Sequence, residues 1–328
     1  MRLEELGEFG LIDRLRRYEG SRPGIHTGIG DDAAVVAGRA GWRTLFTADM
    51  LVEGVHFLPG TDPYRLGRKA MAVNVSDIAA MGGTPTFAAV SLGVPPDTPV
   101  SRVDKIYQGL YDEAARWQAA IVGGDTVRAP ALVLNVALLG EAQEGEVLLR
   151  SGALVGDRIC VTNHIGDAAA GLILLERPEL AVPDGVRERL VLKHLCPSPR
   201  VEAGRELARG IATAAIDLSD GLAGDLMHIC RASGVGAVID AANLPISDDV
   251  RAVAQAAGLD PVSLAISGGE DYELLFTVPS YRQGTHVLPG SGTSYTVIGE
   301  IVDAREGIRL RLPDGELRPL SATGFRHF

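Results

Sequence analysis

Short apolar runs typical of β-strands alternate with amphipathic helical patterns along most of the chain, and this alternation constrains the fold more than any other feature. Strand-like runs at 42–48 and 87–94, for example, lie on either side of a long helical pattern at 64–81. With 328 residues the chain is also longer than one hydrophobic core usually supports. The sequence therefore predicts an α/β or α+β fold with two packed domains.

The remaining elements follow from the same two periodicities. Further strands are expected at 33–37, 120–122, 131–139, 158–162, 213–216, 236–239, 273–278 and 295–301, and further helices at 6–18, 103–119, 168–176, 186–195, 201–209 and 222–232. A polar segment at 141–146 and a turn-like Val155-Gly156-Asp157 indicate a domain boundary near residue 150. We therefore expect an N-terminal domain over 1–150, for ATP, metal and dimerisation, and a C-terminal α/β domain over 151–328.

The overall charge excludes some classes of partner. A formal net charge of -11 argues against nucleic acid and anionic membranes, because both need clustered Lys and Arg. No apolar stretch approaches the roughly 18 residues of a membrane span. The three cysteines are Cys160, Cys196 and Cys230, which form no C-x-x-C pair, so neither a disulfide framework nor a zinc-finger pattern fits. We expect a cytoplasmic protein with reduced thiols.

The most informative residues are aspartates that follow apolar strand-like runs or lie in Gly-rich turns. They are Asp31, Asp32, Asp49, Asp125, Asp217 and Asp220, and Asp77 joins them from inside an apolar helical pattern. Strand ends converge on one crevice in α/β sheets, and two carboxylates about 4 Å apart repel by about 4 kcal/mol at an effective dielectric near 20. Cations must then be present, and Mg²⁺ is the ion that combines carboxylates with substrate phosphates.

Each of these aspartates alone also has a plain structural explanation. Asp31 and Asp32 suit a turn or a helix N-cap, and the Gly-Gly-Asp at 123–125 suits a tight turn. Asp217 and Ser219 suit the capping of a helix that begins near Leu222. The metal site is favoured because the structural explanation would have to hold at every position at once.

Common nucleotide motifs are missing. The spacing Gly28-x-Gly30-x-x-Ala33 follows no convincing strand and would place two carboxylates against a pyrophosphate, so we reject a dinucleotide fingerprint. No G-x-x-x-x-G-K-[ST] and no protein-kinase loop set occurs. Any nucleotide must be held by another architecture.

Taken in order, the motifs resemble the thiamine-monophosphate kinase family within the aminoimidazole ribonucleotide synthetase-like superfamily. The resemblance spans nearly the whole chain. The matching segments are 7–9, 28–35, 47–57, 74–82, 123–126, 217–222, 267–274 and 324–328.

This resemblance implies a two-domain fold whose N-terminal α/β domain forms a β-barrel across a homodimer and whose C-terminal domain is an α/β sandwich. It implies transfer of a phosphate from ATP to thiamine monophosphate, with several Mg²⁺ ions. The implied metal ligands are Asp32, Thr47, Asp49, Asp77, Asp125, Asp217 and Asp220, of which Asp49, Asp77 and Asp125 are the expected catalytic residues. The implied ATP contacts are Tyr107, Gly124, Asp125, Arg150 and Ser219, and the implied acceptor contacts are His56, Glu270 and Phe325.

Ala48 departs from the family pattern, because the family commonly has a hydroxyl residue there. Only a backbone carbonyl remains for a metal contact at that position. Several implied contacts also have alternatives from the residues alone. Arg150 suits an inter-domain ion pair, Glu270 suits a solvated turn, and Tyr107, His56 and Phe325 suit packing.

Rival functions share the fold. The chain has no cysteine before Cys160 and none at its C-terminal end, which speaks against selenophosphate synthetase-like and hydrogenase-maturation enzymes. An aminoimidazole ribonucleotide synthetase-like enzyme and a non-catalytic, magnesium-dependent nucleotide sensor remain as alternatives. The acceptor motifs at His56, Glu270 and Phe325 favour the kinase. The kinase should transfer phosphate directly, because a phosphate monoester is already a competent nucleophile at neutral pH.

Overall fold

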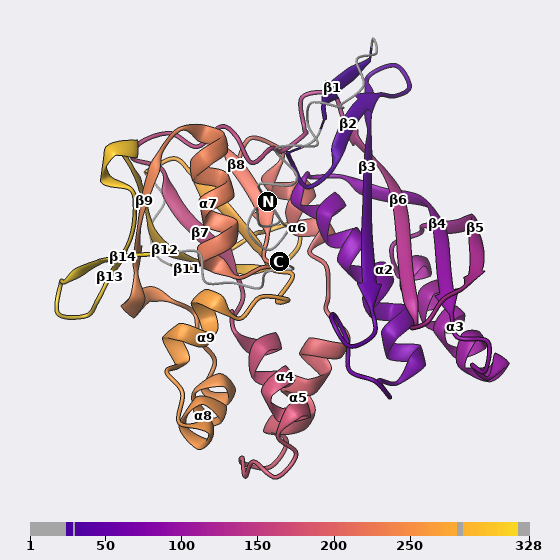
Figure 1. The fold of residues 1–328 in the computed structure, drawn as a ribbon. Coiled ribbons are helices and arrows are strands. Elements are labelled where there is room, and N and C mark those ends of the chain that lie inside the picture. Colours follow the sequence, from indigo (N-terminus) through magenta and orange to yellow (C-terminus); the bar gives the residue numbers. More distant parts are fainter. Residues whose placement is uncertain (1–23, 29, 281–284, 321–328) are drawn as a thin grey trace, which may run out of the picture.

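Two lobes lie side by side, each built around its own β-sheet (Figure 1). The computed structural model describes residues 24–28, 30–280 and 285–320. The helix expected at 6–18 and the C-terminal motif at 324–328 lie outside these residues. The mixed α/β fold with two sheets confirms the predicted fold class. No helix within the described ranges combines the length and the apolar character needed to cross a bilayer.

The N-terminal lobe contains a six-stranded mixed sheet in the order β1-β2-β3-β6-β4-β5. Its strands are β1 (Ile25–Thr27), β2 (Ala34–Ala37), β3 (Trp42–Val52), β4 (Thr84–Val94), β5 (Ala120–Arg128) and β6 (Val133–Gln143). Along β3 the side chains alternate strictly, with Leu45, Thr47 and Leu51 buried and Phe46 and Met50 exposed. The first set faces the helices of this lobe, and the second set lies on the outer face of the sheet.

Two helices cover the inner face of this sheet, α2 (Pro63–Ala80) and α3 (Val100–Arg116). Helix α2 begins at Pro63, whose fixed φ suits the first turn, and the Asp62 carboxylate accepts the N–H of Arg65 at 2.9 Å. Gly67 lets α3 approach closely, because a Cβ there would stand 1.9 Å from the carbonyl oxygen of Ile106. Most of α2 is therefore buried.

The C-terminal lobe is built on a second mixed sheet in the order β14-β13-β9-β12-β7-β10-β8, with β11 beside β12. Its strands are β7 (Arg158–Thr162), β8 (Ala214–Asp217), β9 (Gly236–Asp240), β10 (Leu274–Val278), β11 (Thr285–Val287), β12 (Ser294–Val302), β13 (Ile308–Arg311) and β14 (Leu317–Pro319). The helices are α4 (Asp167–Glu176), α5 (Val186–Leu195), α6 (Val201–Leu207), α7 (Leu222–Ser233), α8 (Asp248–Ala257) and α9 (Pro261–Ser267), with 3-10 turns at Ala241–Asn243 and Ala304–Glu306.

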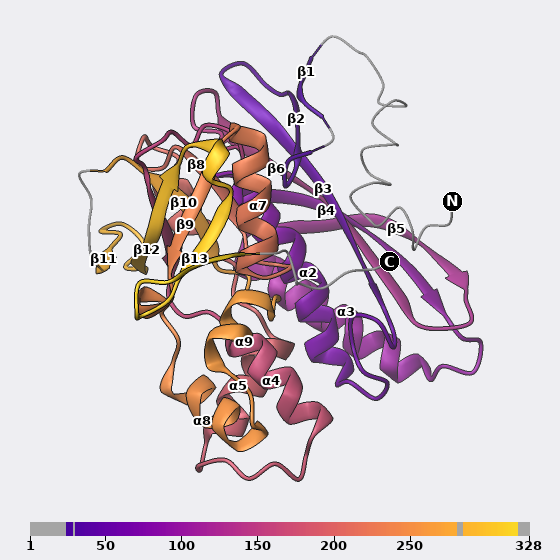
Figure 2. The same cartoon turned by 60° about the vertical axis from the view of Figure 1, so that its left-hand side comes forward.

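The hydrophobic cores of the two lobes interlock along α2, which runs between the two sheets (Figure 2). Ala80 at the end of α2 belongs to a cluster with Cys160 and Phe276 of the C-terminal sheet, while Val201 of α6 packs into the N-terminal core. A Cβ at Gly204 would stand 1.9 Å from the carbonyl oxygen of Ala79, so α6 lies directly against α2. This junction positions the candidate site.

Candidate active site

Three carboxylates from three elements meet at the junction of the lobes. Asp32 precedes β2, Asp77 lies on α2 and Asp217 ends β8. One oxygen from each lies within 4.8 Å of the others. All three were predicted as metal ligands, and their oxygen-only donor set is the type that Mg²⁺ prefers.

Helix α2 connects this group to both lobes. Asp77 Oδ2 accepts the hydroxyl of Thr47 on β3 at 2.5 Å. One position earlier, the Ser76 hydroxyl donates to Asp217 Oδ2 at 2.6 Å. Of these two consecutive residues of α2, one is a carboxylate of the group and the other holds the carboxylate from the C-terminal lobe.

Asp49 joins the group from the inner face of β3. Its backbone N–H donates to Asn74 Oδ1 at 2.9 Å, so α2 also fixes this part of β3. The side chains of Asp49 and Asp77 interact through a hydrogen bond that favours the charged form of Asp49. The sequence analysis missed the supporting roles of Asn74 and Ser76, although both lie in the motif around Asp77.

Burial makes the carboxylates hard to ionise together. It is the main cause that raises the pKa of Asp217 from 3.8 to about 8, and the nearby Asp32 carboxylate adds to it. Burial and then the charge of Asp49 raise the pKa of Asp77 well above its ordinary value. Burial also raises the pKa of Asp49 and Asp32. A group of this kind favours either protons or bound cations.

Arg150 supplies one positive charge at the edge of the group. Its guanidinium donates to Asp32 Oδ1 from Nη2 at 2.5 Å and from Nε at 3.2 Å. Its backbone N–H donates to the Asp31 carboxylate at 3.1 Å, while burial raises the pKa of Asp31 to about 7. The ion-pair alternative for Arg150 is thus observed, and its contact with ATP stays a prediction.

The second carboxylate oxygen of Asp32 differs from the first in its hydrogen bonding. Asp32 Oδ2 is buried and has no hydrogen-bond partner in the described part of the chain. A buried carboxylate oxygen without a partner carries a large desolvation cost. A cation bound there would remove that cost.

The loop with Ser219 and Asp220 borders the same group. Helix α7 has Gly221 as its N-cap and no side-chain capping bond, so the capping explanation for Asp217 and Ser219 is wrong. Instead, the Asp225 carboxylate accepts the backbone N–H groups of Asp220 at 3.3 Å and Gly221 at 3.1 Å. Asp225 shapes the loop and was missed, because an acidic residue in a first helical turn is common without such a role.

Asp125 lies elsewhere, on the exposed edge strand β5. It pairs with Ser91, which pairs with Asn135, which pairs with Met50, and residues opposite one another share a face of the sheet. That face is the outer one, whereas Asp49 points to the inner face. Three strand spacings of ~4.8 Å also separate β3 from β5 by about 14 Å. Within one chain, Asp125 does not join the group.

Two predicted ATP contacts accompany Asp125. Tyr107 on α3 is half-buried and its hydroxyl is hydrogen-bonded to Thr126. Gly124 has a φ of 154°, and a Cβ there would stand 1.8 Å from the carbonyl oxygen of Val90. The five predicted ATP contacts therefore fall into two sets, one on β5 and α3 and one with Arg150 and Ser219 at the junction.

The predicted acceptor contacts are also separated. His56 is half-buried and its Nδ1 accepts the backbone N–H of Val52 at 3.0 Å. Glu270 lies at the junction, where its carboxylate forms an ion pair with the buried Lys69, so the solvated-turn alternative for Glu270 is wrong. Phe325 lies outside the described residues.

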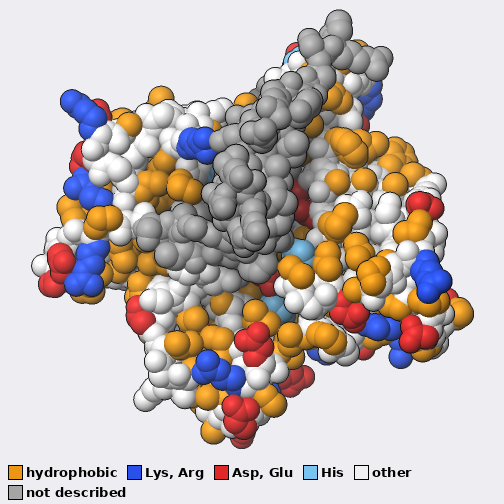
Figure 3. Space-filling view, viewed as in Figure 1, with side chains coloured by type: hydrophobic (Ala, Val, Ile, Leu, Met, Phe, Trp, Pro, Cys, Tyr) orange, Lys and Arg blue, Asp and Glu red, His pale blue; other side chains and the backbone are white. Residues whose placement is uncertain are grey.

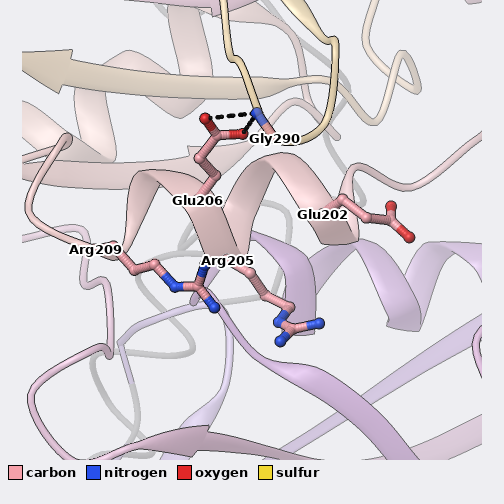
Figure 4. A pocket seen from close by; sticks show the side chains of 5 residues that line it. All are labelled: Glu202, Arg205, Glu206, Arg209 and Gly290. Atoms are coloured by element: carbon pink, nitrogen blue, oxygen red, sulfur yellow. Dashed lines mark hydrogen bonds between the residues drawn. The ribbon is translucent and has the colours of Figure 1, made fainter.

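A surface cavity of about 290 Å³ lies on α6 and involves none of the predicted site residues (Figure 4). It is lined by Glu202, Arg205, Glu206, Arg209 and Gly290. The Glu206 carboxylate accepts the N–H groups of Gly290 and Ser291, so it fastens a surface loop to the helix. Its two acids and two arginines favour no single class of ligand.

Comparisons with known proteins show the family of this chain. Residues 30–142 match the family described as AIR synthase related protein, N-terminal domain, and residues 155–311 match its C-terminal domain. The chain is 41% identical to thiamine-monophosphate kinase of Escherichia coli K12 over 98% of each chain. It resembles a solved structure of AaThiL complexed with AMPPCP and TMP, with a TM-score of 0.88, 36% identity, and coverage of 100% of this chain and 99% of that one.

A second solved structure supports the same likeness. The thiamine-monophosphate kinase of Stenotrophomonas maltophilia K279a has a TM-score of 0.75 and 38% identity, covering 95% of this chain and 98% of that one.

Proposed function

This chain belongs to the thiamine-monophosphate kinases of the AIR synthase related family, and from this membership we propose that it transfers the γ-phosphate of ATP to thiamine monophosphate, giving thiamine diphosphate and ADP. The chain is a phosphotransferase with ATP as its co-substrate. The observation that carries the proposal is the buried carboxylate group at the lobe junction, within a chain 41% identical to a named kinase of this type.

Magnesium ions fit this site. Asp32, Asp77 and Asp217 offer oxygens only, and the unpartnered Asp32 Oδ2 provides a free acceptor among them. These three residues would hold the first ion, and Asp49, Thr47 and Asp220 border it. When bound, Mg²⁺ neutralises charge on the transferring phosphate. The chain's own residues orient the site, because Ser76 and Thr47 fix one oxygen each of Asp217 and Asp77.

Transfer is direct in this proposal. The acceptor phosphate is already nucleophilic at neutral pH and needs positioning more than deprotonation. His56 Nδ1 accepts a backbone N–H, and the aspartates of the group would be engaged as ligands of the ions. Rapid quenching after incubation with γ-labelled ATP, without acceptor, should leave no hydroxylamine-sensitive label on the protein. Label that passes to thiamine diphosphate at the turnover rate would contradict direct transfer.

A homodimer is supported by the outer face of the six-stranded sheet. Phe46, Leu139 and Phe87 form a row across β3, β6 and β4, and the two phenylalanines are 47% and 53% exposed. Figure 3 shows hydrophobic side chains gathered on the lobe that contains this sheet. A second copy that covers this face would bury them and complete a barrel. Light scattering should give twice the chain mass, and Phe46→Glu should shift it toward the monomer.

The same face carries Asp125, so a second copy would enclose it. We propose that Asp125, with Tyr107 and Gly124, serves the site of the partner subunit. This assignment reconciles the predicted metal role of Asp125 with its separation from the carboxylate group of its own chain.

The free cysteines Cys160, Cys196 and Cys230 and the use of ATP suit a cytoplasmic location. The domain boundary near residue 150 is likewise retained as a proposal, between the last strand of the first sheet and β7.

The decisive experiment measures ADP release by the purified protein with ATP and Mg²⁺, with and without thiamine monophosphate. The kinase releases ADP only when the acceptor is present and forms thiamine diphosphate in equal amount. An aminoimidazole ribonucleotide synthetase-like enzyme would ignore thiamine monophosphate, and a sensor would bind ATP without turnover. Either result would refute the proposed function.

A further inference from the structure

Helix α2 carries a buried positive charge that the carboxylate group does not use. Lys69 is only 1% exposed, and burying a lysine cation is costly unless it has a close partner. Its Nζ lies 2.7 Å from Glu270 Oε1. The pair joins the N-terminal lobe to the segment that follows α9 in the C-terminal lobe.

A second side chain lies close to the other oxygen of Glu270. His194 on α5 is 3% exposed, and its Nδ1 lies 3.2 Å from Glu270 Oε2. Burial, and then the Lys69 cation, lower the pKa of His194 to about 4, so the imidazole is neutral at neutral pH. Neither nitrogen forms a hydrogen bond within the described residues, so each is a buried polar atom that lies close to the carboxylate. Each oxygen of Glu270 therefore has a buried nitrogen of another helix beside it.

The backbone of Glu270 is fixed as well. Its φ is 60°, in the left-handed region that non-glycine residues rarely adopt. Its N–H donates to the carbonyl of Ser219 at 2.8 Å, and the N–H of Tyr272 donates to that of Leu218 at 2.9 Å. Such local strain persists where surrounding contacts determine the conformation, and it clusters at ligand sites.

One face of α2 contacts two parts of the C-terminal lobe, at Asp217 and at Glu270. Lys69 and Ser76 are separated by about two helical turns and so lie on the same side, about 10 Å apart along the axis. Ser76 holds Asp217 of the carboxylate group, and Lys69 holds Glu270. The helix thus sets the spacing between the predicted metal site and the predicted acceptor contact.

We propose that Lys69 and His194 are positioning residues that hold the Glu270 carboxylate in the orientation that binds the acceptor. This inference rests on the proposed function, which makes Glu270 an acceptor contact. The carboxylate is 27% exposed and keeps acceptor capacity beyond its two fixed contacts. Its negative charge suits the cationic, amine-bearing ring system of thiamine monophosphate and not the phosphate, which belongs at the metal site.

The test compares three variants in a two-substrate rate analysis. Lys69→Met keeps the apolar stem and removes the charge, and it should fold because Glu270 is exposed enough to reach water. His194→Leu removes the polar nitrogen beside Glu270 Oε2, whereas His194→Asn restores a nitrogen close to the position of Nδ1. The matched control is Lys193→Met, since Lys193 is a neighbouring but 52% exposed lysine.

Lys69→Met and His194→Leu should each raise the KM for thiamine monophosphate about 10-fold, while the KM for ATP stays within about twofold. His194→Asn should recover most of the loss, and Lys193→Met should behave as wild type. A purely structural role would lower thermal stability without this selective effect on one substrate, and His194→Asn would not rescue it.

The outcomes separate the inference from the proposed function. If wild type forms no thiamine diphosphate, the proposed function fails. If wild type is active and folded Lys69→Met and His194→Leu show unchanged KM for the acceptor, or equal changes for both substrates, the positioning role is refuted. Should Lys69→Met fail to fold, the comparison of His194→Leu with His194→Asn decides alone.

Discussion

Asp77 and Asp125 lie on opposite sides of the same six-stranded sheet. Asp77 lies on the helix that covers the inner face, where three other aspartates and Thr47 surround it. Asp125 lies on the edge strand β5, on the face that also exposes Met50, and its carboxylate accepts the N–H of the next residue, Thr126, at 2.8 Å. Both residues lie in segments that resemble motifs of the family, so motif membership alone does not show that two residues reach the same place within one chain.

Substitutions in the carboxylate group, on the inner side of the sheet, should lower turnover the most. Asp77→Asn should lower turnover at least about 100-fold, because the variant loses a carboxylate from the predicted metal site. The metal-free variant should keep its fold and gain thermal stability, since like charges are crowded around Asp77. Circular dichroism and ADP release measure both, with the exposed Asp97→Asn as control. Near-normal turnover in folded Asp77→Asn would remove Asp77 from the metal site.

Substitution of Asp125, on the outer side of the sheet, should also lower turnover, but a second subunit should be able to restore part of it. Asp125→Asn alone should also lose turnover, but mixing its subunits with Asp77→Asn subunits should restore about a quarter of wild-type activity, because half of randomly formed dimers then contain one complete site of two. Co-expression with two affinity tags isolates the mixed dimer. No activity in the mixed dimer, despite confirmed assembly, would place Asp125 in the site of its own chain.

The two regions should also differ in their response to pH. Asp217 has its pKa raised from 3.8 to about 8, so in the metal-free protein its stabilising contribution is fully present below about pH 3.8 and is lost as the pH rises through about 8. Magnesium must displace that proton. The gain in Tm on adding Mg²⁺ should therefore be larger at about pH 8.5 than at about pH 6. A gain that does not change with pH in differential scanning fluorimetry would contradict protonation of the group.

The smallest effect on turnover is expected from a substitution at Ala48, where the family commonly has a hydroxyl residue. Its side chain lies on the outer face between Phe46 and Met50 and is opposite Ala137, so a hydroxyl there points away from the carboxylates of its own chain. Ala48→Thr should change turnover and the Mg²⁺ dependence by less than about threefold. A larger gain in Mg²⁺ affinity would show that this position contacts an ion through its side chain.

The sequence predicts the elements well where periodicity is strong. The expected strand at 158–162 and the expected helix at 186–195 agree with β7 and α5, and the long helical pattern at 64–81 agrees with α2. Helices α8 and α9 were missed, although Ser247 and Asp260 cap them. Helix α9 has only seven residues, but α8 buries Val250, Val253 and Ala254 at helical spacing, so its cap and its apolar pattern could have predicted it. Strands β13 and β14 were missed because they are short and partly exposed at a sheet edge.

The candidate site was predicted only in part. The strand-like run before Asp217 agrees with its burial, whereas Asp77, inside an apolar helical pattern, is only partly buried. The proposed roles of Lys69 and His194 could not be predicted, because they depend on contacts of both residues with Glu270, which is distant from each of them in the chain. Nor does the sequence show which face of the sheet Asp125 will occupy inside β5, since a shift of one residue reverses the face.

The burial of α2 between two interlocked cores also has a consequence for how the chain folds. Ala80 packs with the C-terminal sheet and Val201 with the N-terminal core, so neither half can bury its apolar surface alone. Local unfolding that exposes one end of α2 must disturb both lobes, and the amides of this helix should exchange with solvent only through global opening. During synthesis, part of the apolar surface of α2 would therefore stay exposed to solvent until the ribosome has released enough of the second sheet to cover it.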